Sequence, residues 1–102
     1  MNQGIWSKTA VGTNSGATAT QTAVTGHTYV VTWISGHTDA DSTVSITDGT
    51  NTLWQIALDV SAEGYKFHCS GLEIPIPIST TAVGVIAASF ADCQVTLGGY
   101  IL

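Results

Sequence analysis

The sequence predicts an all-β domain, built as a sandwich of about seven or eight short antiparallel strands. Apolar and polar residues alternate with period two along most of the chain, which is typical of half-buried strands. Turn-forming residues recur at ~8–12-residue spacing, as in sandwiches and barrels. No stretch shows the 3.6-residue period of an amphipathic helix. The length of 102 residues fits one domain.

The first predicted strands are Thr-rich or β-branched. Residues 17–24 (ATATQTAV) are Thr-rich, and 27–34 (HTYVVTWI) are β-branched and aromatic throughout, which favours strands. Both faces of the second run are largely apolar, so we expect a central strand covered on both sides. Polar composition predicts a loop at 35–42 (SGHTDADS).

A hairpin is predicted in the middle of the chain. Residues 43–47 form a strand with Val44 and Ile46 facing inward. The pair Asp48-Gly49 is the strongest turn signal in the sequence, because glycine accepts the positive φ that a tight turn requires. The return strand covers about 51–59, and a further turn follows at 61–64.

The last predicted strands cover residues 65–70, 83–90 and 95–102, with a turn near Asp92. In the first of them, alternation separates inward from outward side chains. The inward ones are Tyr65, Phe67 and Cys69, and the outward ones are Lys66 and His68.

The segment 71–78 (GLEIPIPI) is predicted to be an edge strand or a loop-like connection. Pro75 and Pro77 occupy one face, and proline cannot donate to a strand ladder. The other face is apolar and consists of Leu72, Ile74, Ile76 and Ile78.

Residues 1–16 differ from the rest of the chain, and we divide the sequence into this segment and a β-sandwich domain at 17–102. The segment is either a frayed tail or first edge strand, or an N-terminal arm. An arm would pack Trp6 into a neighbouring subunit, because large aromatic side chains are typical interface anchors.

The composition points to self-association. Charged residues make up 9 % of the chain, hydrophobic residues 44 %, and the mean hydropathy is +0.30. A chain of this size buries only ~60–68 % of its unfolded surface on folding. The surplus apolar surface is therefore expected to lie against further copies or a larger assembly, which favours a structural protein over an enzyme.

The net charge of −5 and the isoelectric point of about 4.6 argue against nucleic acid and anionic membranes as partners. The N-terminus lacks the basic and apolar regions of a signal peptide, and no apolar run reaches the ~20 residues of a membrane span. We therefore expect a protein made and used without Sec export.

Metal binding finds little support in the sequence. His27, His37 and His68 lie on separate segments without metal-ligand spacing. The loop around Asp39 and Asp41 begins like an EF-hand, but lacks its central glycine and terminal glutamate. A solvated acidic loop is the preferred interpretation, with a weak cation site beside His37 as the alternative.

No catalytic motif is found, so we predict no catalytic residue, no cofactor and no enzymatic activity. The chain has no GxSxG sequence, and nothing in it pairs Glu63 or Glu73 with Asp59 or Asp92 as acid and base. The pair Gly98-Gly99 lacks a phosphate-loop context and predicts a bulge or a close backbone approach.

Cys69 and Cys93 are 24 positions apart and lack metal-site spacing. Two buried thiols are the preferred interpretation. The alternative is one disulfide formed after release into an oxidising environment.

The aromatic residues suggest a carbohydrate-binding alternative, because aromatic faces stack on sugars. Trp33 and Trp54 lie in strongly apolar strands, so we expect them in the core, with Trp33 on the face of Tyr29. Trp6 and Tyr100, near the termini, are freer to make contacts.

Several segments together resemble small tailed-phage β-sandwich structural proteins, which include capsid decoration (cement) proteins and head or fibre-base components. The segments are TGHTYVVTWISG, V-x-I-x-D-G-T…L-W at 44–54, L-x-I-P-I-P-I at 72–78 and V-x-L-x-G-Y at 95–100. The resemblance implies a jelly-roll-like sandwich, often trimeric, seated on a capsid without catalytic residues or cofactor.

The leading hypothesis is a capsid decoration protein that stabilises a phage head as a trimer. Its partners would be its own copies and the major capsid protein, on the virion surface after assembly in the host cytoplasm. The interface candidates are Ile5, Trp6, Ile76, Ile78 and Tyr100. The alternative is a carbohydrate- or receptor-binding module of a phage fibre or adhesin, which requires aromatic side chains exposed in one patch.

Overall fold

A computed structural model describes residues 4–59, 65–89 and 91–102, and these form eight strands and no helix. The strands are β1 (Gly4–Gly12), β2 (Ser15–Gln21), β3 (Tyr29–Thr38), β4 (Ser42–Thr47), β5 (Thr52–Leu58), β6 (Tyr65–Pro75), β7 (Ala82–Ser89) and β8 (Cys93–Ile101).

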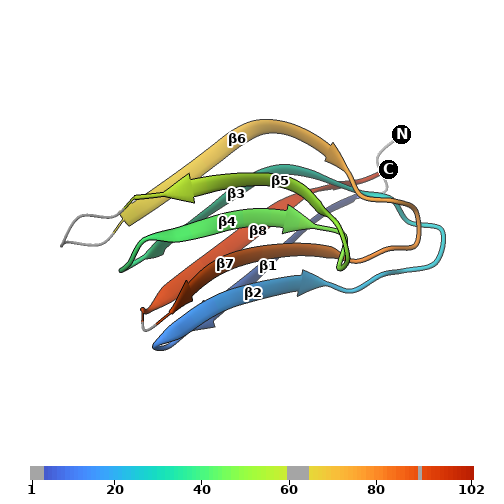
Figure 1. The fold of residues 1–102 in the computed structure, drawn as a ribbon. Coiled ribbons are helices and arrows are strands. Elements are labelled where there is room, and N and C mark those ends of the chain that lie inside the picture. Colours follow the sequence, from blue (N-terminus) through green and yellow to red (C-terminus); the bar gives the residue numbers. More distant parts are fainter. Residues whose placement is uncertain (1–3, 60–64, 90) are drawn as a thin grey trace.

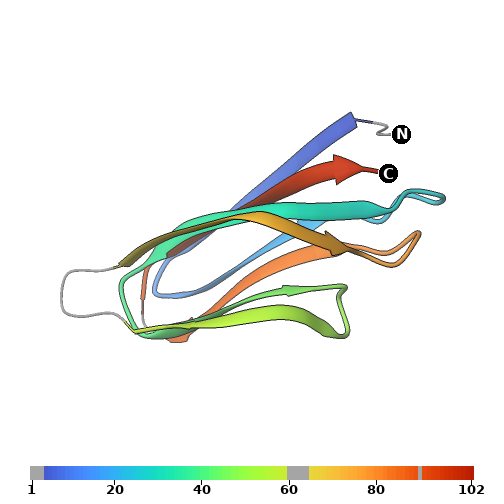
Figure 2. The same ribbon diagram turned by 90° about the horizontal axis from the view of Figure 1, so that it is seen from above.

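The strands form two four-stranded sheets packed as layers (Figures 1 and 2). Their orders are β1-β8-β3-β6 and β2-β7-β4-β5, and every neighbouring pair is antiparallel. This is the eight-strand order of a jelly roll. The predicted all-β, jelly-roll-like sandwich is therefore confirmed.

The core lies between the two sheets and consists of their inward apolar side chains. Val44 and Ile46 of β4 are fully buried, as predicted. Across the core, β7 and β8 approach closely at Gly84, where an added Cβ would lie 3.0 Å from a Cδ atom of Leu97. A glycine in β7 thus makes room for a leucine of the opposite sheet.

The described part of the N-terminal segment, residues 4–16, belongs to the sandwich. Residues Gly4–Gly12 pair with β8 along their whole length, from Gly4 opposite Ile101 to Gly12 opposite Cys93. The alternative of a first edge strand is thus the one observed. Trp6 is only 7 % exposed, because its ring packs on Tyr29 with 5.3 Å between ring centroids.

Strand β3 is longer than the sequence predicted. It is central in its sheet, as expected, but the side that carries Trp33 is the outer face of the sheet, so the expected cover on both sides is wrong. It also continues through Thr38, inside the segment 35–42 that we predicted as a loop. The polar composition was misleading because Thr38 faces inward. It is fully buried and its hydroxyl lies 3.3 Å from the sulfur of Cys93.

Strand β6 is an edge strand and ends at Pro75, which confirms the edge prediction for the proline-rich segment. Ile76 is fully buried, and its backbone N–H donates to the carbonyl of Tyr29. Ile78, expected on the same apolar face, is 64 % exposed because the chain leaves the sheet before it.

The alternation predicted for residues 65–70 is confirmed where the structure describes side chains. Phe67 is buried and Cys69 half-buried, whereas Lys66 and His68 are exposed. The side chain of Tyr65 lies outside the described part of the chain, as do the predicted turn at 61–64, with Glu63, and the end of the strand at residue 90. Both cysteines are free thiols, and Cys93 is buried.

The predicted turn at Asp48-Gly49 joins β4 to β5, and Gly49 has a φ of 97°. The Asp48 carboxylate accepts hydrogen bonds from the backbone N–H groups of Asn51 (2.6 Å) and Thr50 (2.9 Å). These bonds stabilise the charged form and lower the pKa of Asp48 below the ordinary value of an aspartate.

We therefore expect Asp48→Ala to destabilise the fold at neutral pH and much less in acid. A carboxylate whose pKa is lowered by folding contributes stability above its unfolded pKa and loses it as the pH falls through the folded value. Urea unfolding at pH 7 and at about pH 3 measures the difference between variant and wild type. An equal difference at both pH values would contradict the role of the charged carboxylate.

No helix within the described residues has the length and hydrophobicity needed to cross a membrane.

Candidate functional site

On the outer face of the sheet β1-β8-β3-β6, rows of mostly polar side chains surround one tryptophan. Strand register aligns outward residues in four rows across the sheet. The rows are Ile5, Tyr100, Val30 and Pro75; Ser7, Gly98, Trp33 and Ser70; Thr9, Thr96, Ser35 and His68; and Val11, Gln94, His37 and Lys66. Hydroxyl groups thus surround Trp33 on β1, β8, β3 and β6.

A β-bulge in β3 brings Trp33 to this outer face. Against β8 the register shifts between Val31 and Trp33, so that Thr32 is the extra residue. Against β6 it shifts at the same place, but there the extra residues lie on β6. Val31 and Ile34 both face the core and are fully buried, whereas Trp33 between them is half-buried on the outside. A bulge changes the direction in which a side chain points, which is why Trp33 does not share the face of Tyr29.

The Trp33 ring packs against the glycine pair in β8. An ideal Cβ on Gly98 would lie 2.7 Å from Cζ2 and 2.9 Å from Cε2 of Trp33, so the indole occupies the space of the missing side chain. Gly99 approaches the carbonyl oxygen of Val30 too closely for any Cβ. The close backbone approach predicted for Gly98-Gly99 is therefore confirmed.

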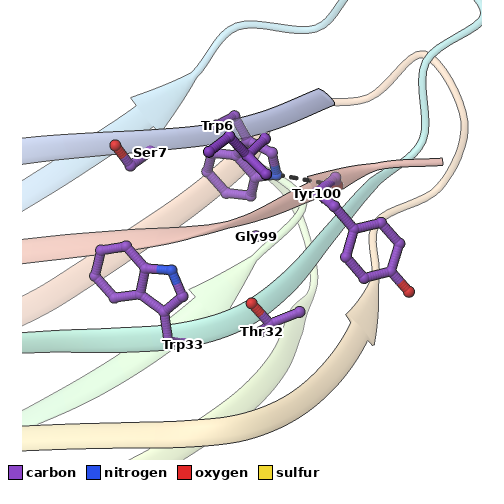
Figure 3. A pocket seen from close by; sticks show the side chains of 7 residues that line it. Trp6, Ser7, Thr32, Trp33, Gly99 and Tyr100 are labelled. Carbon is purple, nitrogen blue, oxygen red and sulfur yellow. Dashed lines mark hydrogen bonds between the residues drawn. The ribbon is translucent and has the colours of Figure 1, made fainter. Parts of the chain in front are cut away.

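Two hollows flank Trp33. One, of about 480 Å³, lies toward β1 and β8 and is lined by Ile5, Ser7, Trp33 and Tyr100 among others (Figure 3). The second, of about 490 Å³, lies toward β6 and is lined by Thr32, Trp33, His68, Ser70 and Gly71. The second hollow lies at the irregular pairing of β3 with β6, where residues 71–73 of β6 lie opposite Thr32 alone.

Tyr100 lines the first hollow and reaches Glu73 of β6 with its phenol. Figure 3 shows its ring pointing away from Trp6, whose indole N–H donates to the Tyr100 carbonyl (3.2 Å). The phenol donates a 2.9 Å hydrogen bond to the Glu73 carboxylate. This bond and the negative charge of Glu73 raise the pKa of Tyr100 above the ordinary value, so the phenol stays a neutral donor.

The interface candidates from the sequence fall into two groups. Trp6 and Ile76 are buried in the core of this chain, and Trp6 reaches the surface only at the first hollow. Ile5 and Ile78 are 88 % and 64 % exposed, and Tyr100 lines the first hollow. A contact with a partner through these three remains a prediction.

The other sequence candidates are not brought together. Within residues 4–59, 65–89 and 91–102, no group of three or more His, Cys, Asp or Glu side chains could hold a metal ion. His37 and His68 lie on the outer face of the sheet, whereas His27 precedes β3 at the other end of that strand. Trp54 is half-buried and packs against the core, as expected.

Sequence reasoning missed Trp33 as a surface residue. Strict alternation through HTYVVTWI placed it in the core, and no residue in that run signals a bulge. The available signal was on another strand, since consecutive glycines in a strand mark a place where a large side chain from a neighbour can lie.

Comparison with known proteins supports the fold only. No protein-family model and no curated protein matches the chain. The GH26-CBM35 β-(1,4)-mannanase of Podospora anserina matches with a TM-score of 0.50 and 10 % identity, over 92 % of this chain and 27 % of the mannanase. The protein described here thus spans about a quarter of that enzyme.

Two further solved structures are similar. CsCBM6-3 of Clostridium stercorarium, solved with cellobiose, matches with a TM-score of 0.49 and 11 % identity, over 90 % of this chain and 72 % of its own. The CBM36-1 domain of a multidomain xylanase from the hindgut metagenome of Trinervitermes trinervoides matches with a TM-score of 0.48 and 12 % identity, over 89 % of this chain and 76 % of its own. The chain is a β-sandwich, and at this sequence identity the similarity concerns the fold alone.

Proposed function

We propose that the protein is a non-catalytic carbohydrate-binding domain that holds a glycan on the outer face of the sheet β1-β8-β3-β6. The observation that carries the proposal is the half-buried Trp33, laid over Gly98 in the middle of a face of hydroxyl side chains. The proposal rests on this surface rather than on the fold.

The chemistry of the face suits a sugar. A pyranose has an apolar face of C–H groups, which an aromatic ring covers, and a rim of hydroxyl groups, which donate and accept hydrogen bonds. Ser7, Ser70 and Tyr100 supply hydroxyl groups on the sides of Trp33 where the two hollows lie. An apolar platform with a few convergent polar groups is the usual composition of a small-ligand site.

A glycan array probed with the labelled protein tests the proposal. We expect binding to a related set of glycans that share one sugar unit, and loss of those signals with Trp33→Ala. Leu53→Ala, which changes an exposed side chain on the other sheet, should give the wild-type pattern. A blank array, or signals that Trp33→Ala leaves intact, would contradict the proposal.

A second candidate, the trimeric capsid decoration protein, is favoured by the exposed edge of the sandwich. Strand β1 is a nine-residue edge strand without proline, and it carries Ile5 (88 % exposed) and Val11 (71 % exposed). Long edges with exposed apolar residues favour pairing with another chain. The opposite edge, β6, is protected by Pro75.

For this candidate we expect a trimer by multi-angle light scattering, converted to monomer by Ile5→Lys because a charge on the edge opposes pairing. The trimer should also bind assembled phage heads from which decoration proteins have been removed. A wild-type monomer with no affinity for such heads would contradict it.

A further inference from the structure

The two hollows lie on opposite sides of one aromatic ring, and this arrangement constrains the ligand. Trp33 forms part of both of them. Ser7 on β1 lines the first and Ser70 on β6 lines the second, and both belong to the same row across the sheet. A molecule seated on Trp33 can therefore continue in both directions across the strands.

The dimensions of the row fit several linked sugar units. Ser7 and Ser70 are separated by three strand spacings, which is about 14 Å at ~4.8 Å per spacing. One pyranose ring on Trp33 would leave both hollows empty. A terminal sugar would need a wall that stops the chain on one side of the ring, whereas both sides of Trp33 are hollowed (Figure 3 shows the first).

We infer that the ligand is an internal stretch of a linear glycan that runs across the strands. This inference rests on the proposed carbohydrate-binding function. The central ring lies on Trp33, and one neighbour occupies the hollow at Ser7 and the other the hollow at Ser70. Glu73, which is held by Tyr100 on this face, disfavours an acidic sugar beside it, so the ring on that side is neutral.

Calorimetric titration with a length series of one glycan identified on the array tests the inference. We expect affinity to rise about fivefold with each ring from one to three, which is the effect of one or two net hydrogen bonds, and to level off beyond three. Affinity that is the same for the monosaccharide and the trisaccharide would overturn the inference while leaving the proposed function intact. Absence of binding at every length would remove both.

Two variants that fill one hollow each sharpen the test. Ser7→Phe should lower trisaccharide affinity about fivefold more than it lowers monosaccharide affinity, and Ser70→Phe should do the same from the other side. Thr18→Phe, at an exposed position on β2 of the other sheet, is the matched control and should bind like wild type. Circular dichroism confirms that each variant is folded.

If only one of the two filling variants weakens the trisaccharide, the glycan ends at Trp33 and the inference of an internal stretch is overturned. Equal losses for the monosaccharide and the trisaccharide would also overturn it, because the inserted ring would then be displacing Trp33 itself.

Discussion

Trp33→Ala is expected to lower glycan affinity at least about 30-fold, the loss of roughly 2 kcal/mol that is typical of a tryptophan at the centre of a binding site. The fold should remain, because Trp33 is half-buried on the outside of the sheet and Val31 and Ile34 keep the core filled. Calorimetric titration gives the affinity, and a thermal unfolding curve confirms the fold.

Two companion variants separate loss of the ring from loss of its position. Trp33→Phe keeps an aromatic face and should retain part of the affinity. Gly98→Ala keeps Trp33 but puts a Cβ 2.7 Å from its Cζ2 atom and 2.7 Å from the backbone oxygen of Trp6, so both the indole and the neighbouring strand β1 must shift and affinity should fall as well. Wild-type affinity in Trp33→Ala would show that this ring is not the platform.

Leu97→Ala is expected to produce the largest loss of stability, about 2–5 kcal/mol. Leu97 is fully buried, and its Cδ atoms lie against Gly84 of the opposite sheet. Gly84 has no side chain that could move into the cavity, so the space stays empty. For a domain of this size the Tm should fall by roughly 10–30 °C.

Leu53→Ala is the matched control, because it removes the same atoms from an exposed position on β5. Its Tm should lie within a few degrees of wild type. Similar Tm values for Leu97→Ala and wild type would contradict the close packing of the two sheets at this point.

Much of the fold could be predicted from local patterns. The hairpin at Asp48-Gly49 follows from turn chemistry, and the inward positions of Val44 and Ile46 follow from strict alternation. The edge position of β6 follows from Pro75, which cannot donate to a ladder. Each of these depends on residues that are close in sequence.

The binding face could not be predicted, because it depends on contacts between distant strands. The bulge at Thr32 changes the direction in which the Trp33 side chain points. The glycine against which that side chain packs, Gly98, lies 65 positions later than Trp33. The polar run 35–38 was predicted as a loop because the outward Ser35 and His37 and the buried Thr38 are all polar, which together gives the composition of a loop. Pairing with β6 and β8 makes it a strand.

The central claim is that ligand binds the outer face of the sheet β1-β8-β3-β6, and NMR titration of the ¹⁵N-labelled protein with the trisaccharide tests it most directly. We expect shift changes at the Trp33 indole N–H and at the amides of Ser7, Ser70 and Tyr100, with β4 and β5 unaffected. Changes confined to the sheet β2-β7-β4-β5 or to the loops would contradict the claim.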